Sequence, residues 1–276
     1  MTSVTVVVDN RPGLEGLEPE WGLALWIEHQ GKAILYDTGQ GATLMANLAA
    51  LGLDPARLAG VVISHGHLDH IGGLGPLLAA RSGQPLAVWC HIGSFDAHYK
   101  EEDDGLKDIG PPLGGRAAYE DRGAQFNFVD VYAQPWPGLH LLAPVPRRTS
   151  FEQPPPGLVT MLGPAVLPDP VTEDLVLALE TAAGPLAITG CAHAGSANIL
   201  LHVQQVMARP VAWLLGGLHL DRLEPLPRQD TLEFLASQPQ LRVAAGHCTG
   251  EQALGDLQAL LEGRLTPLSL GLRLEF

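Results

Sequence analysis

The sequence predicts an α/β protein, built as a four-layer αββα sandwich, and three observations lead to this fold class. Short runs of β-branched or apolar residues recur along the chain with turn residues between them, as expected of sheet strands. Segments with apolar residues at helical spacing lie between several of these runs. The second half of the chain repeats the scheme of the first, so we expect two similar half-units that each supply a sheet and its covering helices.

In the first half we expect strands at 5–8, 23–28, 33–36, 61–64 and 86–90, and helices at 42–51 and about 72–80. In the second half we expect strands at 175–180, 186–189, 212–215 and 241–245, and helices at 196–207 and 249–261. We interpret residues 1–276 as a single domain of two half-units, because α/β folds often exceed the usual domain size as one unit.

The middle stretch, about residues 98–170, differs from both half-units. It carries the charged run 100–104 and two turn-rich clusters, 110–115 and 154–157. Little of it has the pattern of a core element, so we expect it to be irregular. It is either a linker between the half-units or a lid, because long irregular segments in compact enzymes often cover sites.

Composition restricts the class of partner. The 276 residues are 46% hydrophobic and 17% charged, which is typical of a folded protein. A formal net charge of −14, with 16 Lys and Arg, argues against nucleic-acid binding, which usually needs a basic stripe. An anionic small molecule is still compatible with this charge, because bound divalent cations dominate the local field.

The compartment is predicted from the amino terminus and the cysteines. The amino terminus has no basic segment, and its apolar stretch is too short for a signal peptide or a membrane span. The three cysteines contain no CxxC pair and are odd in number, which argues against a disulfide framework. We therefore expect a cytoplasmic protein without membrane contact, and a homo-oligomer is compatible with this sequence.

A histidine-rich run from Ser64 to His70 carries the clearest chemical signal. It directly follows the apolar run 61–63, which predicts a buried strand whose end opens into a ligand crevice. His65 and His67, separated by one glycine, can point together from an extended loop, whereas Asp69 and His70 can face a second position. This spacing predicts two adjacent metal sites, and each needs further ligands.

Two later strand ends offer those ligands. His193 follows the predicted strand 186–189, and His247 follows the predicted strand 241–245. The sequence also suggests that Thr249 and Gln252 form a capping box at the helix after His247. His219 lies after a further buried strand and could touch substrate or replace an assigned ligand. His91 ends another strand and has a weaker functional signal.

Asp37 and Cys191 are expected beside the ligands. Asp37 ends a strand ahead of the histidine run and could hydrogen-bond a ligand, thereby fixing the tautomer of a histidine. Its alternative role is that of a turn aspartate. Cys191 could be a soft metal ligand or a small buried hydrophobic residue, and we favour packing.

The order Asp37, His65 to His70, His193 and His247 resembles the metallo-β-lactamase superfamily over nearly the whole chain. More narrowly, the chain resembles the branch named for 7,8-dihydropterin-6-ylmethyl-4-(β-D-ribofuranosyl)aminobenzene 5′-phosphate synthase, an enzyme of methanopterin biosynthesis. The segments that carry this likeness are 8–10, 36–40, 146–147, 168–170, 190–195, 216–220 and 246–250. A serine is commoner in that branch where Ala192 stands. Glyoxalase-like members usually carry Gly-Asp where Gly190-Cys191 stands, so that relationship is disfavoured.

We therefore expect a dinuclear site with His65, His67 and His193 on one metal and Asp69, His70 and His247 on the other. Two cations lower the pKa of a bound water and stabilise charge on the attacking and leaving oxygens. Hydrolysis of an ester or phosphoester is therefore the expected reaction. We expect Asp69 to be a catalytic residue. Zinc is the expected metal, although these ligands also suit manganese or iron.

The expected partner is a phosphorylated small molecule. Arg147, Arg148 and Lys107 could bind phosphate or be solvated surface charge, and the resemblance adds Asn10 and His219 as substrate contacts. The resemblance also implies an alternative reaction, in which a pterin methyl diphosphate is joined to a ribofuranosyl aminobenzene phosphate. A non-catalytic metal-dependent binding protein is disfavoured, because purely structural zinc sites usually close with four Cys or His ligands.

Overall fold

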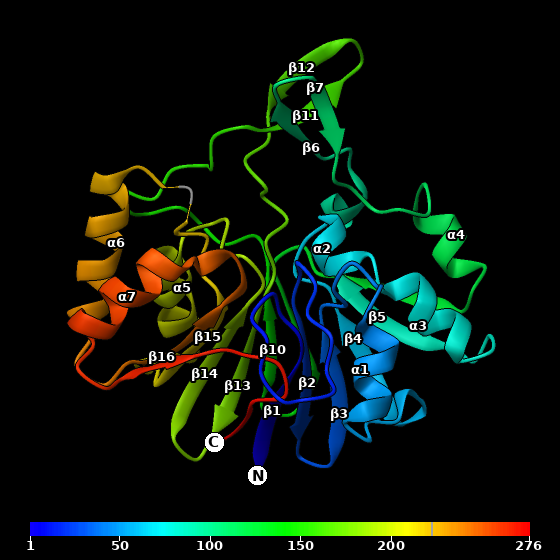
Figure 1. Cartoon of the computed structure of the whole chain (residues 1–276), viewed down its shortest axis with the longest axis horizontal. Coiled ribbons are helices and arrows are strands. Elements are labelled where there is room, and N and C mark those ends of the chain that lie inside the picture. Colours follow the sequence, from blue (N-terminus) through cyan, green and yellow to red (C-terminus); the bar gives the residue numbers. More distant parts are fainter. Residues whose placement is uncertain (222) are drawn as a thin grey trace.

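Two β-sheets packed face to face form the centre of the structure, and helices cover the outer face of each (Figure 1). The computed structural model describes residues 1–221 and 223–276. The arrangement confirms the predicted αββα sandwich. Both termini lie at one end of the sandwich, and the loops around α2 (Leu68–Ile71) lie toward the other end.

The first sheet has seven strands. Its order is β18 (Arg273–Glu275), β1 (Thr2–Val8), β2 (Ala24–His29), β3 (Lys32–Tyr36), β4 (Leu58–Val62), β5 (Leu86–Cys90) and β8 (Ala124–Phe128). Strands β3, β4, β5 and β8 run parallel to one another, whereas β1 to β3 are antiparallel. The helices of this half are α1 (Leu44–Ala50), α2, α3 (Leu74–Ala80) and α4 (Arg116–Glu120).

The second sheet also has seven strands. Its order is β17 (Leu265–Pro267), β16 (Arg242–Gly246), β15 (Trp213–Gly217), β14 (Gly184–Thr189), β13 (Val176–Thr181), β10 (Leu139–Leu142) and β9 (Tyr132–Trp136). Strands β14 to β17 are parallel. The helices α5 (Ser196–Met207), α6 (Pro225–Ala236) and α7 (Glu251–Leu260) lie on this half (Figure 1). None of the described helices is both long and apolar enough to cross a membrane.

Three apolar clusters hold the four layers together. Alternate residues of the strands face opposite sides of each sheet, so residues such as Val6, Ile34 and Leu177 meet between the two sheets. Their neighbours in sequence face the helices: Leu35 packs under α1 and α3, and Ala178 packs under the helices of the second half. Both faces of the central strands are therefore buried, which explains their nearly continuous apolar sequences.

The parallel strands of both sheets end at one edge of the sandwich. Asp37 follows β3, the histidine run follows β4, and His193 follows β14. His219 follows β15, and His247 lies in a short 3-10 turn, η3 (His247–Thr249), directly after β16. The carboxyl ends of parallel strands thus bring residues from distant parts of the sequence to one place, as is usual in α/β proteins.

The stretch 98–170 has more regular structure than its sequence predicts. It contains α4, β8, β9 and β10, together with a separate four-stranded sheet, β12-β11-β6-β7. The strands of that sheet are β6 (Tyr99–Glu102), β7 (Gly105–Asp108), β11 (Leu158–Leu162) and β12 (Ala165–Pro168). The small sheet projects from the sandwich (Figure 1), and β7 and β12 are exposed throughout. Since these strands bury little of their surface, their sequences lack the core pattern.

One local prediction is wrong. Thr249 and Gln252 do not form a capping box, because the residue before α7 is Gly250, which has a φ of +81° and offers no side-chain cap. The Oγ1 atom of Thr249 instead accepts a hydrogen bond from the backbone N–H of Leu218, 3.1 Å away. The Thr249 hydroxyl therefore links the loops after β15 and β16.

Candidate metal centre

The loop after β4 places three histidines in the interior of the edge where the sheets meet. His65 and His70 are fully buried, and His67 is 5% exposed. The loop can pass this close to its neighbours only with glycine at 66, because a Cβ atom there would lie 2.5 Å from the carbonyl oxygen of Ser94. Glycine at 190 has a similar cause, since its Cβ would lie 2.1 Å from the Ser64 hydroxyl. Gly66 thus lets the loop after β4 pack against the turn after β5, and Gly190 lets the two half-units approach each other at the site.

The first cluster joins His65, His67 and His193. His65 Nε2 lies 3.0 Å from His67 Nδ1 and 3.2 Å from His193 Nε2. Nitrogen donors bound to one zinc ion stand roughly 2.8–3.3 Å apart, as follows from zinc–nitrogen distances of about 2.0 Å and angles of about 90–110°. The spacing of the three imidazoles therefore fits a common cation.

The second cluster joins Asp69, His70 and His247. Asp69 Oδ2 lies 3.4 Å from His247 Nε2 and 3.9 Å from His70 Nε2. His247 Nε2 is buried and has no hydrogen-bond partner among the described residues. An orphaned imidazole nitrogen beside a carboxylate is what a metal site without its ion leaves behind, so this donor set also fits a divalent cation.

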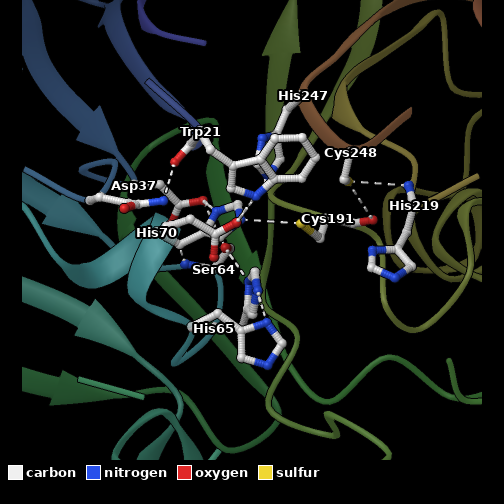
Figure 2. A network of polar contacts seen from close by, with 12 residues as sticks. Trp21, Asp37, Ser64, His65, His70, Cys191, His219, His247 and Cys248 are labelled. Atoms are coloured by element: carbon white, nitrogen blue, oxygen red, sulfur yellow. Dashed lines mark hydrogen bonds and ion pairs between the residues drawn. The ribbon is translucent and has the colours of Figure 1, made fainter. Parts of the chain in front are cut away.

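Hydrogen bonds outside the two clusters fix the histidine tautomers. Asp37 Oδ2 lies 2.7 Å from His70 Nδ1 and accepts a hydrogen bond from the Ser64 hydroxyl, while Oδ1 accepts the Ser64 backbone N–H (Figure 2). Asn10 Oδ1 lies 3.0 Å from His247 Nδ1. In the neutral form of each ring, an Nδ1 proton of His70 or of His247 directed at an oxygen leaves the Nε2 lone pair facing the cluster.

The backbone at the site is held in an uncommon conformation. Asp37, Ala192, His219 and His247 have φ values of +56°, +58°, +49° and +49°. Non-glycine residues in this left-handed region cost of order 1–3 kcal/mol each and concentrate at functional sites. The fold therefore tolerates local strain at four of the strand ends that carry the predicted site residues, those of β3, β14, β15 and β16.

Burial and neighbouring charges set the protonation of the donors. Burial lowers the pKa of His67 to about 3 and lowers the pKa values of His65 and His193 well below the ordinary value, so these rings are neutral. Burial opposes ionisation of Asp69, but the charges of His70 and His247 lower its pKa below the ordinary value. Burial also lowers the pKa of His70, but the Asp37 and Asp69 carboxylates outweigh it and raise that pKa to about 9.

A cavity of about 190 Å³ opens beside both clusters. Its floor includes His67, Asp69 and His193. Residues of the small sheet and the chain leading from it form one wall: Lys100, Lys107, Ile109 and Leu158. The lining also includes Trp21, Cys191, His219, Asp221 and Cys248. Three of the six predicted metal donors thus face a space that can hold a small molecule.

The residues predicted to contact substrate have different surroundings. His219 lines the cavity, and its ring lies 4.5 Å from that of His193. Arg147 is half-buried and donates to the carbonyl oxygens of His193 and Pro170, at 2.7 and 2.6 Å. Asn10 also donates to the carbonyl oxygen of His247. The contacts of Arg147 and Asn10 therefore support the two metal-site loops.

Of the remaining candidate residues, some line the cavity and others make contacts away from it. Lys107 lines the cavity. The guanidinium of Arg148 contacts Gln205 on α5. His91 accepts a hydrogen bond from the backbone N–H of Gly93, so it acts in the local turn after β5. Cys191 lines the cavity, and its Sγ lies 3.1 Å from His70 Nε2.

Trp21 and the pair His98–Asp169 were missed by sequence reasoning. Trp21 Nε1 donates to Asp69 Oδ2 at 2.9 Å, and its ring lies 5.2 Å from that of His247 (Figure 2). Buried His98 binds Asp169 through Nδ1 at 2.7 Å and packs against the His67 ring. Asp169 lies in one of the segments that carry the family resemblance, which was the available signal. Trp21 lies in a loop whose sequence has no strand, helix or metal-ligand pattern that would single it out.

Comparisons with known proteins identify a family and two relatives. The profile of the metallo-beta-lactamase superfamily matches residues 22–247. The 7,8-dihydropterin-6-methyl-4-(beta-D-ribofuranosyl)-aminobenzene-5'-phosphate synthase of Methanocaldococcus jannaschii is 25% identical over 256 residues, covering 85% of this chain and 84% of that protein. An uncharacterised protein of the same organism is 24% identical over 264 residues, covering 93% and 94% of the two chains.

A solved structure also resembles the whole chain. The crystal structure of Tm1679, described as a metal-dependent hydrolase of the beta-lactamase superfamily, has a TM-score of 0.85 and 25% sequence identity. The alignment covers 100% of this chain and 99% of that one. Together with the profile match, this likeness confirms the resemblance found in the sequence.

Proposed function

Because the chain belongs to the metallo-β-lactamase superfamily, we propose that it is a dinuclear metal-dependent hydrolase acting on an ester or phosphoester small molecule. The observation that carries this proposal is the convergence of six donor residues into two adjacent clusters beside one cavity. The solved structure described as a metal-dependent hydrolase supports the same reaction class.

The proposed ligands are His65, His67 and His193 for one cation and Asp69, His70 and His247 for the other. Two divalent cations, zinc in our proposal and manganese or iron as alternatives, would lower the pKa of a water and stabilise charge on the attacking and leaving oxygens. Asp69 is the ionised carboxylate of the set. The Trp21 N–H holds the Asp69 carboxylate in place, and Asp37 holds His70.

An anionic substrate is supported by two lysines. Lys100 and Lys107 are directly opposite each other on β6 and β7, and both line the cavity. Like charges directly opposite on neighbouring strands are destabilising, so their position suggests a use in binding. Glu102 balances part of this charge, at 3.2 and 3.8 Å from the two ammonium groups. We propose that the small sheet acts as a lid and brings these ammonium groups to a phosphate or carboxylate.

A second candidate function is favoured by the Methanocaldococcus relative. In a synthase-type transfer, this chain would join a pterin methyl diphosphate to a ribofuranosyl aminobenzene phosphate and release diphosphate. The two candidates differ in their products. Incubation with both synthase substrates must yield diphosphate and a coupled product for the transfer, whereas hydrolysis yields the pterin alcohol without coupling.

The test combines metal analysis with a substrate screen. Protein purified without added metal should contain about two equivalents of a divalent metal and should hydrolyse generic phosphodiesters or esters in a metal-dependent manner. His67→Ala should lose metal from the first cluster and lose turnover. His202→Gln is the matched control, because His202 is partly buried on α5 and is absent from both clusters.

The outcomes separate the alternatives. Full activity in the His67→Ala variant would overturn the assigned site. Stoichiometric metal without metal-dependent turnover of any ester, phosphodiester or synthase substrate would favour a metal-dependent binding protein over an enzyme.

A further inference from the structure

The two hairpins of the small sheet are joined at their bases by a buried pair of side chains, His98 and Asp169. His98 directly precedes β6, and Asp169 directly follows β12 (Figure 1). The two residues are 2% and 6% exposed, and His98 Nδ1 lies 2.7 Å from Asp169 Oδ2. The other ring nitrogen of His98 lies 3.2 Å from the carbonyl oxygen of Gly93 and 3.4 Å from Glu173 Oε1. Contacts on both sides therefore fix the ring where the small sheet leaves the sandwich.

The backbone of each member of the pair closes its own hairpin. The carbonyl oxygen of His98 accepts the N–H of Ile109, and the N–H of Asp169 donates to the carbonyl oxygen of Leu158, both at 2.9 Å. Asp169 Oδ1 also accepts the N–H of Val171 at 2.8 Å, on the chain that returns to the sandwich. Because buried polar groups are costly to leave unpaired, these bonds hold both hairpins in one arrangement.

The same pair contacts the loop of the first metal cluster. The His98 ring lies 5.3 Å from the His67 ring and is nearly perpendicular to it, at 84°. A Cβ atom at position 66 would lie 2.6 Å from His98 Nε2, so the ring packs directly on the backbone of Gly66. On the other side of His67, the N–H of Leu68 donates to the carbonyl oxygen of Ile109 at 2.6 Å. The base of the β6–β7 hairpin therefore holds this loop on both sides of His67.

Beyond the pair, the hairpins form a wall of the cavity. Lys100 lies two residues after His98, with Lys107 opposite it on β7 and Leu158 opposite it on β11, and these three residues line the cavity. The pairing of β6 with β11 spans two residues of each strand, so the buried pair is a main connection between the hairpins. The position of the two cavity lysines, Lys100 and Lys107, relative to the metal loop is therefore set at the base of the small sheet.

We propose that His98 and Asp169 are positioning residues that hold the two cavity lysines at a fixed separation from the first metal cluster. This inference rests on the proposed function, in which the lysines bind an anionic group of the substrate while the cations act on its ester bond. Such binding helps only if both groups are held in one geometry, and side chains outside the cavity usually supply that support. The pair therefore acts on the substrate through the lysines and the metal loop.

The test is a double-mutant cycle between the pair and the two cavity lysines in the zinc-loaded protein. Asp169→Ala should raise the KM for bis-para-nitrophenyl phosphate by nearly the factor that Lys100→Ala/Lys107→Ala produces. The kcat value and the KM for uncharged para-nitrophenyl acetate should change little, because the metal donors are intact. In the double lysine variant, Asp169→Ala should raise the KM by less than about twofold more, since residues that act as one unit are not additive.

Asp104→Ala is the matched control, because it removes an exposed carboxylate from the turn between β6 and β7. It should change the KM by less than about twofold. An unchanged KM in Asp169→Ala would overturn the inference. So would an equal KM rise with and without the two lysines, or an equal rise for the charged and uncharged esters, because the pair would then support the fold without positioning the lysines.

Hydrogen exchange of the wild-type protein gives a second test that does not depend on the folding of a variant. Zinc fixes the His67 ring, against which His98 packs, so zinc should slow backbone exchange in residues 98–109 and 158–169 as well as in the metal loops. Exchange in α6 should not change. Zinc binding without slower exchange in the two hairpins disproves this inference alone, whereas a protein that binds no zinc, or binds it and hydrolyses no ester, disproves the proposed function.

Discussion

Asp37 shows how one buried carboxylate can organise a metal centre without belonging to the proposed ligand set. It is fully buried, yet its two oxygens meet the Ser64 backbone N–H, the Ser64 hydroxyl and His70 Nδ1. A buried carboxylate that lost these partners would be costly, so the contacts stabilise both the charge and the loop. The strand end of β3 thereby sets the orientation of a histidine that follows β4.

We predict that Asp37→Asn weakens metal binding by about 10- to 100-fold, the usual effect of removing the group that orients a histidine ligand. The amide keeps the size of the side chain but presents one acceptor oxygen instead of two. Competition with a chromophoric chelator measures the affinity. Asp130→Asn, a change at an exposed position, is the control, and equal affinities in the two variants would contradict the orienting role.

Among the secondary-structure elements, α5 depends on a buried residue from the middle stretch. Glu152 is 4% exposed, and its carboxylate accepts the backbone N–H groups of Ala197 and Asn198, both at 2.9 Å. These are orphan donors in the first turn of the helix, and a carboxylate there also complements the helix dipole. Because α5 begins three residues after His193, Glu152 also fixes the loop that carries this histidine.

We predict that Glu152→Ala lowers the free energy of unfolding by about 2–3 kcal/mol, because it leaves two buried N–H groups without an acceptor. Urea unfolding followed by circular dichroism measures the loss. Glu15→Ala, at an exposed position, should change the free energy by less than about 0.5 kcal/mol. Equal stability of the two variants would show that Glu152 does not support α5.

The hairpin β6–β7 gives a second prediction about an element. We predict that Lys100→Ala/Lys107→Ala raises the KM for an anionic phosphodiester roughly 5- to 30-fold, since each partly exposed charge contributes about 0.5–1 kcal/mol. The effect should weaken at high salt, because exposed charges are screened. The kcat value and the KM for an uncharged ester should change little.

Lys32→Ala is the matched control for this double variant, because Lys32 lies over Trp136 and is not part of the cavity wall. An equal rise in KM for charged and uncharged substrates would mean that the two lysines act on the shape of the small sheet and not through their charge.

In the whole molecule, the two proposed metal clusters join the two half-units. The donors in the loop after β4 and in α2 belong to the first half. His193 and His247 follow strands of the second sheet. Each cluster takes donors from both halves, so a cation bound at either one links the two sheets. Binding to the folded state alone must then stabilise the sandwich as a unit.

We predict that removal of metal by a chelator lowers the thermal unfolding midpoint by roughly 5–10 °C, if the free metal stands at about 100 times its dissociation constant. Re-addition of zinc should restore the midpoint. The shift should be smaller in His67→Ala, which lacks a ligand of the first cluster. An unchanged midpoint after complete metal removal would show that the site forms without contributing to stability.

The amino-acid sequence by itself determined the sandwich and the strand-end positions of Asp37, the histidine run, His193 and His247. These features are local, because apolar strand patterns and the spacing of metal-binding residues can be recognised from neighbouring residues in the sequence. The small projecting sheet could not be predicted from the sequence, because strands such as β7 and β12 bury too little surface to need an apolar pattern.

The packing of the two halves decided the rest. Whether Arg147 reaches a substrate or a carbonyl oxygen, and whether Cys191 packs or faces His70, depends on contacts between residues more than 20 positions apart. Trp21 meets Asp69 across 48 positions. The sequence therefore predicted which side chains could bind metal. Only the tertiary structure brought their donor atoms together, because the close approach of the two half-units at Gly190 depends on contacts between segments far apart in the sequence.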